Sequence, residues 1–260
     1  MEVKDLKKIE KAHYKVQKGV FFSVKKKISG ATLLWSDKIT DAFWNYACLI
    51  NAKQPEELIK EVIEFYKSKN RKPAFYLTPW TKPKNFETIL QNQGFKLAYK
   101  DAWQVYTGSK EINSPANLEI KEVKTPEEKR VFIETFNKAF SGENPGDPYG
   151  ALPKEYGETA KLSFRKRYWK NYIVYSDNSP VATGSLAISG KFAAIYSIGT
   201  HPNFRKKGFG TVIVNFCTKK AWEAGCEFIF LQTVKDSYNE KLYNKLGFET
   251  AFIGICWALE

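Results

Sequence analysis

The segment Arg205–Gly210, with the sequence Arg-Lys-Lys-Gly-Phe-Gly, is the part of this chain that says most about its fold. It lies between a strand-like run at Phe192–Ile198 and a helix-like run that starts near Thr211. The first N–H groups of a helix have no intrahelical acceptor, and the helix dipole adds roughly half a positive charge there. Glycines at 208 and 210 let the backbone approach an anion with no Cβ in the way. The spacing R-x-x-G-x-G therefore predicts a phosphate-binding turn that opens a helix.

Two better-known phosphate-binding motifs do not fit this turn. The P-loop ends in Gly-Lys-Ser/Thr, and no such run follows here. The dinucleotide fingerprint G-x-G-x-x-G needs a first glycine that this segment lacks. We therefore expect a phosphate cradle of another class.

The residues after 117 alternate between strand and helix periods. Strands are predicted at Leu118–Val123, Asn171–Ser176, Val181–Ile188, Phe192–Ile198, Glu227–Val234 and Ala251–Ala258. Helices are predicted at Pro126–Phe140, near Lys154–Lys166, after the glycine turn, and at Tyr238–Leu246. The helix after the turn is expected to place Phe209, Ile213, Phe216 and Cys217 on one face. This pattern predicts an α/β fold of the α+β type, in which helices flank a central mixed β-sheet.

The composition indicates a globular chain of one large domain or two ordinary ones. Its 260 residues are 43% hydrophobic, which is enough to build real cores. No apolar run approaches the length of a membrane span, and the N-terminus lacks the apolar region of a signal peptide. Four cysteines without Cys-x-x-Cys spacing and only two histidines argue against a zinc site or a disulfide framework. We expect a cytoplasmic protein with no metal.

The net charge of +13 is distributed unevenly along the chain. Residues 1–110 hold 21 Lys and Arg against 11 Asp and Glu, a net of +10, whereas residues 111–260 hold 20 against 17, a net of +3. The excess thus lies mostly away from the glycine turn, and a diffuse surplus of lysine is typical of a solvated surface. We expect neither a nucleic-acid nor a membrane partner, with nucleic-acid association left as an alternative for the basic half.

A polar stretch at Thr107–Asn117 separates two patterned halves and predicts a linker. We place the domain boundary there, with domains at 1–112 and 113–260. Each half contains a strand, then a Gly-Phe pair, then a tryptophan: Ala74–Leu77, Gly94–Phe95 and Trp103 in the first, and Phe228–Leu231, Gly247–Phe248 and Trp257 in the second. The match predicts a structural duplication.

The first half lacks the anion-binding turn. Where the turn should fall stands Cys48–Leu58, which has no glycine, no arginine, and two acids at the expected helix start. Acids at that end would occupy the positive pole of the helix and repel a phosphate. We expect one anion site, in the second half.

Residues Ile198–Thr211 resemble the acetyl-CoA motif of the GCN5-related N-acetyltransferases (GNAT), and Asn239–Phe248 resembles the family's later helix that ends in Leu-Gly-Phe. The order strand, R-x-x-G-x-G, helix, strand, helix is more specific than either motif, and the resemblance covers the chain from about residue 118 to its end. The first half then resembles the degenerate copy of tandem members. The resemblance implies two GNAT-like domains, of which only the second is catalytic.

The resemblance also implies how acetyl-CoA would bind. The backbone of residues 198–200 would bind the pantetheine arm as a neighbouring strand would, and the amides of residues 205–211 would bind the pyrophosphate. Asn239 would hold the thiol-side arm or a water near it. The expected acetyl-CoA-binding residues are Ile198, Gly199, Thr200, Arg205, Lys206, Lys207, Gly208, Phe209, Gly210, Thr211 and Asn239.

Acyl transfer to an amine needs a neutral amine, a stabilised oxyanion and a proton for the departing thiolate. Tyr243 matches the tyrosine that protonates the thiolate in several family members, and a phenol with a pKa near 10 suits that task. Its alternative role is packing between helix and sheet. A backbone N–H at position 198 or 199 could stabilise the oxyanion. The first-half position aligned with Tyr243 is Leu90, which has no proton to donate.

The acceptor and the general base stay open. In this superfamily the region of Gly142–Pro153 borders the acceptor site, and it contains Glu143, Asp147 and Tyr149. Two acids there favour a cationic amine. Five side chains could relay the amine's proton through water: Glu143, Asp147, Tyr149, Tyr196 and Ser197. His201 stands just before the phosphate turn, where a surface corner is expected rather than a base.

The leading hypothesis is an N-acetyltransferase. It would move an acetyl group from acetyl-CoA, its cosubstrate, to a primary amine of a small molecule or a protein, by direct attack in a ternary complex. We expect a monomer or a homodimer. The alternatives are a catalytically silent sensor that binds acyl-CoA, and a tandem transferase that uses a larger acyl or aminoacyl donor.

Overall fold

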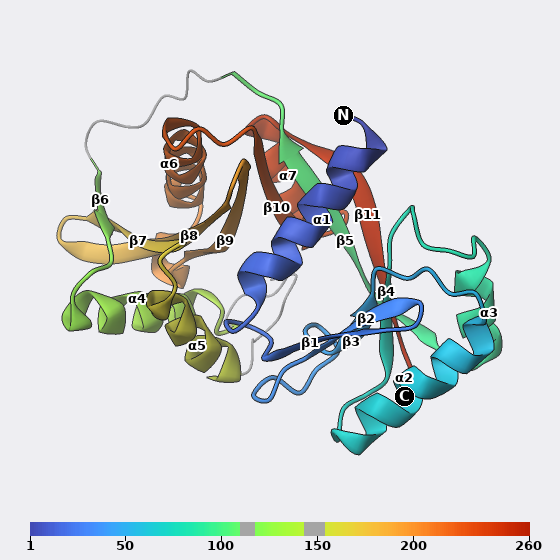
Figure 1. Ribbon diagram of the computed structural model, residues 1–260. Helices are drawn as coiled ribbons and strands as arrows, with labels where there is room; N and C mark the ends of the chain where they lie inside the picture. The colour runs from blue at the N-terminus through green and yellow to red at the C-terminus, as the bar shows by residue number, and fades with distance from the viewer. Residues whose placement is uncertain (110–117, 143–153) are drawn as a thin grey trace. The chain divides into compact units, whose positions relative to one another are not determined.

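The computed structural model describes residues 1–109, 118–142 and 154–260 (Figure 1). These residues form two compact units. The larger unit comprises residues 1–16 and 104–251, and the smaller unit comprises residues 17–103 and 252–260. The boundary falls within two strands, β5 (Lys96–Tyr106) and β11 (Phe248–Ala258).

The larger unit contains a mixed sheet. Its own strands follow the order β10 (Phe228–Val234), β9 (Phe192–Thr200), β8 (Ser179–Ser189), β7 (Trp169–Ser176) and β6 (Glu119–Glu122). β9 and β10 are parallel, whereas β6, β7, β8 and β9 are antiparallel neighbours. Its helices are α1 (Val3–Gln17), α4 (Pro126–Ala139), α5 (Lys154–Ala160), α6 (Phe209–Glu223) and α7 (Tyr238–Lys245), with 3₁₀ turns η1 (Lys161–Arg165) and η2 (Pro202–Phe204).

Helices α4 and α6 cover opposite faces of this sheet (Figure 1). A Cβ at Gly184 of β8 would lie 2.4 Å from Ile213 of α6, so α6 packs directly on that strand. A Cβ at Gly199 of β9 would lie 2.7 Å from the Cβ of Ala139 at the end of α4. Both glycines therefore let a helix approach the sheet closely, one on each face.

The smaller unit also contains a mixed sheet. Its strands are β1 (Val24–Ile28), β2 (Ala31–Trp35), β3 (Tyr46–Cys48) and β4 (Ala74–Leu77), followed by the end of β11 and the start of β5. β3 and β4 are parallel, and β11 is antiparallel to β4. Helices α2 (Pro55–Ser68) and α3 (Phe86–Asn92) belong to this unit. Its core includes the edge-to-face rings of Phe75, Phe86 and Phe95.

Each unit contains a strand–helix–strand segment with parallel strands: β3, α2 and β4 in the smaller unit, and β9, α6 and β10 in the larger. The first turn of α2 holds Glu56 and Glu57, the acids that the sequence predicts at a helix start. The compact units nevertheless differ from the domains expected at 1–112 and 113–260. The end of β11 pairs with β4, the end of β5 lies beside β10, and α1 groups with residues 104–251.

The structure confirms the mixed α/β fold and every helix and strand predicted after residue 117, with shifted ends. The helix expected near Lys154–Lys166 is divided into α5 and η1, where Ser163 Oγ donates to the carbonyl of Ala160 at 2.7 Å. Helix α6 begins at Phe209, two residues earlier than expected, because Gly208 serves as its N-cap in a left-handed conformation.

Candidate functional site

The predicted motif begins on β9, which is irregular at the point where the site is expected. Its pairing with β8 shifts between Thr183 and Ser185, opposite Ser197 and Ile198 of β9. Ser197 has φ 55°, a left-handed value that is uncommon for a residue with a Cβ. Thr183 Oγ1 donates to the carbonyl of Ser197 at 2.9 Å and so fixes the bulge. Such bulges redirect the backbone and side chains that follow them.

The pairing of β9 with its other neighbour is short. Only Phe192, Ala193 and Ala194 pair with β10, although β9 runs on to Thr200 and β10 to Val234. From residue 195 onward, the edge of β9 that faces β10 therefore lies outside the β9–β10 ladder. Strand backbone outside a ladder can pair with an added extended chain.

The basic turn after β9 has a fixed backbone. Arg205 Nε donates to the carbonyl of Thr200 at 3.2 Å, and Arg205 Nη2 donates to the carbonyl of Ala139 at 2.7 Å. The guanidinium of Arg205 thus binds main-chain carbonyls of β9 and of the end of α4. The N–H of Arg205 donates to the carbonyl of Pro202 at 3.2 Å, so the peptide N–H groups after Arg205 are the ones that could face an anion.

Gly208 has the conformation that the phosphate-cradle interpretation needs. Its φ of 86° suits glycine, and no atom lies within 4 Å of the place where a Cβ would stand. Lys206 shares a left-handed conformation, with φ 61°, and Lys206 and Lys207 are exposed. The start of α6 therefore presents bare backbone to solvent between two exposed lysines and the first helical turn.

Helix α6 is anchored by the face that the sequence predicts. Phe209, Ile213 and Cys217 are buried, and Phe216 is half-buried against the ring of Tyr172, with centroids 5.0 Å apart. Burial raises the pKa of the Cys217 thiol, which stays protonated at neutral pH. Its role is packing, which keeps the N-terminus of α6 in place.

The two residues expected on α7 have different surroundings. Asn239, in the first turn of α7, is half-buried. Tyr243 is 6% exposed, belongs to the hydrophobic core, and has its ring centroid 6.3 Å from that of Phe248. Leu90, its counterpart by sequence in the first half, is fully buried in the core of the smaller unit.

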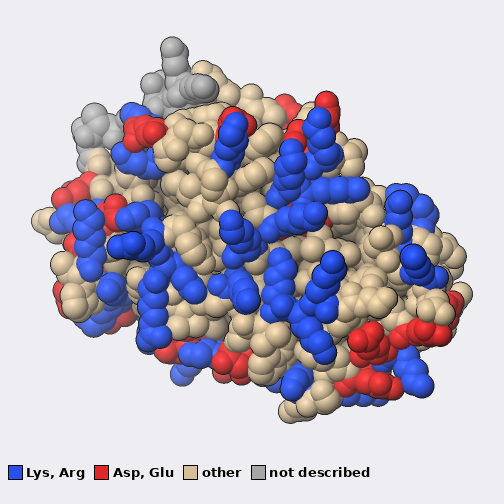
Figure 2. All heavy atoms as spheres, viewed as in Figure 1, with Lys and Arg blue, Asp and Glu red and all other residues tan. Residues whose placement is uncertain are grey.

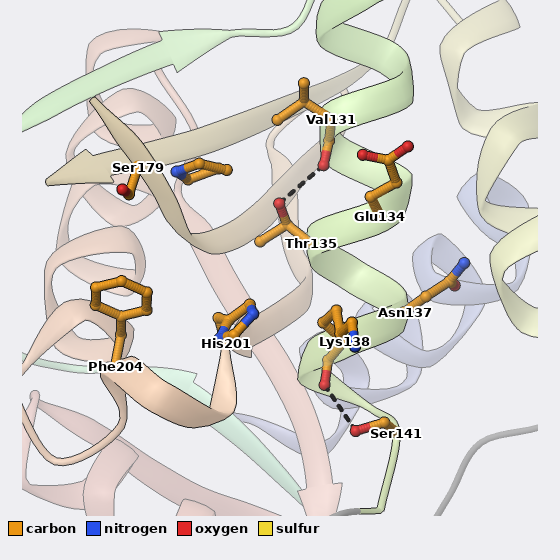
Figure 3. Close-up of a pocket in the computed structure, with 10 residues that line it drawn as sticks. Val131, Glu134, Thr135, Asn137, Lys138, Ser141, Ser179, His201 and Phe204 are labelled. Atoms are coloured by element: carbon orange, nitrogen blue, oxygen red, sulfur yellow. Dashed lines mark hydrogen bonds between the residues drawn. The ribbon is translucent and has the colours of Figure 1, made fainter. Parts of the chain in front are cut away.

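An open groove of about 670 Å³ lies beside the turn (Figure 3). Glu134 and Lys138 of α4 line one side, and Ser179, His201 and Phe204 line the other. None of the expected acetyl-CoA-binding residues lines it. His201 Nδ1 accepts from the N–H of Asn203 at 3.3 Å, so His201 caps η2 as the corner residue that the sequence predicts.

The residues named for the acceptor and the proton relay are only partly described. Glu143, Asp147 and Tyr149 lie outside the described residues. Tyr196 and Ser197 lie on β9, at its bulge. Tyr196 has a partner that the sequence interpretation missed: its hydroxyl is 2.9 Å from Nδ1 of His13, on α1. Only the pattern of α1 hinted at this, since His13 stands on its buried face with Ile9 and Val16.

The opposite face of α1 is basic. Its exposed positions after Val3 are all lysines: Lys4, Lys7, Lys8, Lys11 and Lys15. Blue side chains accordingly gather over α1 in Figure 2, and others are spread over the rest of that view. Part of the excess charge of the first half therefore lies on a solvated helix face.

The described residues have neither a membrane-spanning helix nor a metal-binding cluster. None of the helices there combines the length and apolar character that crossing a membrane requires. Residues 1–109, 118–142 and 154–260 hold no group of three or more His, Cys, Asp or Glu side chains that could bind a metal ion.

Part of the chain matches a known protein family. Residues 132–248 match the model of the acetyltransferase (GNAT) family. This region includes β9, the basic turn, α6 and α7. Among curated protein sequences, none matches this chain significantly.

Solved structures share the fold over nearly the whole chain. A GCN5-related N-acetyltransferase from Kribbella flavida is 18% identical, with a TM-score of 0.70 over 96% of this chain and 94% of that one. An acetyltransferase of the GNAT family from Colwellia psychrerythraea is 11% identical, with a TM-score of 0.57 over 100% and 98%. A tandem GNAT protein from the clavulanic acid biosynthesis pathway is 14% identical, with a TM-score of 0.60 over 88% and 78%. At these identities the likeness is one of fold, and the family model places a domain of the GNAT acetyltransferase family at residues 132–248 of this chain.

Proposed function

We propose that this protein is an N-acetyltransferase that transfers the acetyl group of acetyl-CoA to a primary amine. One arrangement supports this most. A left-handed glycine with open space around it caps α6, after β9 and η2, and β9 pairs with β10 only as far as Ala194. The first feature suits a pyrophosphate and the second suits an extended arm. Acetyl-CoA has both parts in one molecule.

Residues of this chain would bind acetyl-CoA and assist the transfer of its acetyl group. The N–H groups from Lys206 to Thr211 bind the pyrophosphate, since the Arg205 N–H donates to the carbonyl of Pro202, and the backbone of residues 198–200 aligns the pantetheine arm. Acetyl-CoA supplies the activated thioester. A backbone N–H at Ile198 or Gly199 stabilises the oxyanion, a type of contact worth several kcal/mol in comparable sites. Tyr243 protonates the departing thiolate, and Asn239 holds the arm near it.

The smaller unit is proposed to be a copy that has lost this site. It keeps the strand–helix–strand segment β3, α2 and β4, but α2 begins with Pro55, Glu56 and Glu57 instead of a glycine turn. Two carboxylates at the positive end of the helix oppose anion binding. Leu90 stands in place of the proposed acid.

Substitution of Gly208 tests the cradle. We expect Gly208→Val, and likewise Gly210→Val, to weaken acetyl-CoA binding by about 100-fold or more, because a Cβ blocks the anion from hydrogen bonds worth about 1.5–3 kcal/mol each. Isothermal titration with acetyl-CoA measures the change. Gly190→Val is the matched control, since Gly190 also has a positive φ, of 59°, and no neighbour within 4 Å of a Cβ, but lies in the β8–β9 turn. Equal affinity in Gly208→Val and wild type would refute the assignment.

The acceptor requires a screen. Thiol release from acetyl-CoA would be followed with alkylamines, polyamines, amino sugars, amino acids and lysine-containing peptides, and mass spectrometry of the product would identify the acetylated nitrogen. Release with at least one amine is expected.

A silent acyl-CoA sensor is the second candidate. The burial of Tyr243 in the hydrophobic core favours it, because a packed phenol could serve stability alone. Acetyl-CoA binding without thiol release for any amine would identify the sensor.

A further inference from the structure

A row of polar side chains crosses the sheet of the larger unit on the face opposite α6. Asn171, Ser185 and Tyr196 are register partners on β7, β8 and β9. Ser185 Oγ donates to Asn171 Oδ1 at 2.7 Å, and Asn171 Nδ2 donates to Ser163 Oγ at 2.9 Å. Buried polar groups reduce stability unless they are paired, and these hydrogen bonds pair Ser163, Asn171 and Ser185.

Tyr196, the member of the row on β9, contacts a histidine of α1. His13 is 1% exposed, and its Nδ1 lies 2.9 Å from the hydroxyl of Tyr196. With the ring proton on Nε2, Nδ1 accepts a hydrogen bond from that hydroxyl. The ring of Tyr196 stacks on Trp169 with centroids 5.0 Å apart, which fixes the direction of the hydroxyl. Tyr196 and His13 belong to the same compact unit.

Tyr196 also stands where the proposed chemistry takes place. It lies beyond the last residue of β9 that pairs with β10, Ala194, and directly before the bulge at Ser197. It precedes by two positions the Ile198 amide proposed for the oxyanion. Tyr196 is only partly buried, whereas His13 is shielded from solvent. The pair therefore connects a partly buried residue of β9, next to the proposed site, to a buried imidazole.

We propose that Tyr196 and His13 remove the proton from the acceptor amine. This inference rests on the proposed acetyl transfer and adds its missing base. One N–H proton of the acceptor ammonium passes to Tyr196 Oη as the hydroxyl proton passes to His13 Nδ1, which leaves a neutral amine and an imidazolium. The amine then forms the C–N bond and the C–S bond breaks. Of the two protons that the ammonium loses, one passes back from His13 Nδ1 through the partly exposed Tyr196 hydroxyl to solvent, and the other ends on the thiol.

The assignment gives α1 a role in the reaction. Tyr196 touches the amine and is the catalytic residue, whereas His13 acts through it and is a positioning and proton-accepting residue. The hydroxyl of Tyr168 binds the carbonyl of Val16 at 3.3 Å, a second contact that holds the end of α1 on this unit. The expectation that residues 1–112 take no part in catalysis is therefore replaced by a contribution from the first helix.

The test compares two kinds of acceptor. Tyr196→Phe and His13→Gln are assayed with the alkylamine that gives the fastest thiol release and with methoxyamine, which is already neutral at neutral pH. With the alkylamine we expect kcat to fall about 100-fold, the usual effect of losing a general base, and with methoxyamine to fall at least about tenfold less. A side chain that only packs would lower both rates equally.

Tyr172→Phe is the matched control, since Tyr172 is buried on β7 against α6 and outside the row. Acetyl-CoA affinity near that of wild type shows that a variant is folded, and if His13→Gln fails this check, Tyr196→Phe decides alone because it keeps the stacked ring. Unchanged kcat, or equal losses with both acceptors, overturns the relay while the acetyltransferase stands. No thiol release by the wild type with any amine overturns the proposed function and the relay together.

Discussion

Gly208 and Gly199 both belong to the predicted acetyl-CoA motif, but the structure needs them for different reasons. Gly208 is required by its left-handed backbone and stands in open space. Gly199 is required because the end of α4 packs where its side chain would be, with Ala139 and Phe140 at 2.7 Å and 3.0 Å from a Cβ. Spacing alone therefore does not tell whether a motif glycine is needed for backbone conformation or for helix packing.

Tyr243 is either the proposed general acid or a packing residue of the core. We expect Tyr243→Phe to lower turnover by about tenfold or more, since a general acid contributes at least that much, and to leave acetyl-CoA affinity nearly unchanged. Steady-state thiol release and isothermal titration measure the two effects. Tyr238→Phe is the control, because Tyr238 lies on the same helix and is 70% exposed. Turnover equal to wild type would assign Tyr243 to packing, in keeping with its buried ring.

The sequence predicts the elements that hold Gly208 and Tyr243 but not the contact between Tyr196 and His13. The turn, α6 and α7 are local features, so spacing alone placed Gly208 and Tyr243 on the right elements. The Tyr196–His13 pair joins positions 183 residues apart, and no local pattern encodes that contact. The spacing of glycines predicts the local backbone conformation. A histidine on the buried face of a helix predicts only that a hydrogen-bond partner exists, and not which residue it is.

Helix α4 contacts both the groove and the basic turn. Its first turn is closed by a capping box, in which Thr125 Oγ1 accepts from Glu128 N–H at 3.2 Å and Glu128 Oε2 accepts from Thr125 N–H at 2.8 Å. Its last residue, Ala139, accepts from the Arg205 guanidinium. The helix that shapes the groove therefore also holds the phosphate turn.

Thr125→Ala tests how much the cap stabilises this unit. We expect the free energy of unfolding to fall by about 0.5–2 kcal/mol, since one helix N–H loses its acceptor. Denaturant unfolding measures the change, and Lys138→Ala, an exposed substitution on the same helix, serves as control. The hydrogen bonds from Thr125 and Lys124 lower the pKa of Glu128, so its contribution is present above its ordinary pKa and is lost as the pH falls through the lowered value. A loss in Thr125→Ala no larger than in Lys138→Ala would show that the box adds nothing.

Each of the two compact units is built from two separate stretches of the chain. β11 ends beside β4, β5 ends beside β10, and α1 groups with the C-terminal half. Hydrophobic period and turn residues predict that such strands exist, but they do not specify which partner each strand takes. The linker-like composition of Thr107–Asn117 predicts a boundary there, whereas the compact units divide within β5 and β11.

A fragment of residues 113–260 tests this organisation. It keeps the family motif but lacks α1 and the end of β5, so Leu6, Ile9 and Val16 no longer contribute buried side chains worth about 1.5–3 kcal/mol each. That loss is comparable to the whole stability of a domain, about 5–15 kcal/mol, and we expect the fragment to lack a cooperative thermal transition. The control chain joins residues 1–16 to residues 104–260 through a long Gly/Ser linker and should unfold cooperatively. If the 113–260 fragment alone unfolds cooperatively and binds acetyl-CoA as the full chain does, then α1 is dispensable to this unit and the boundary predicted from the sequence is the functional one.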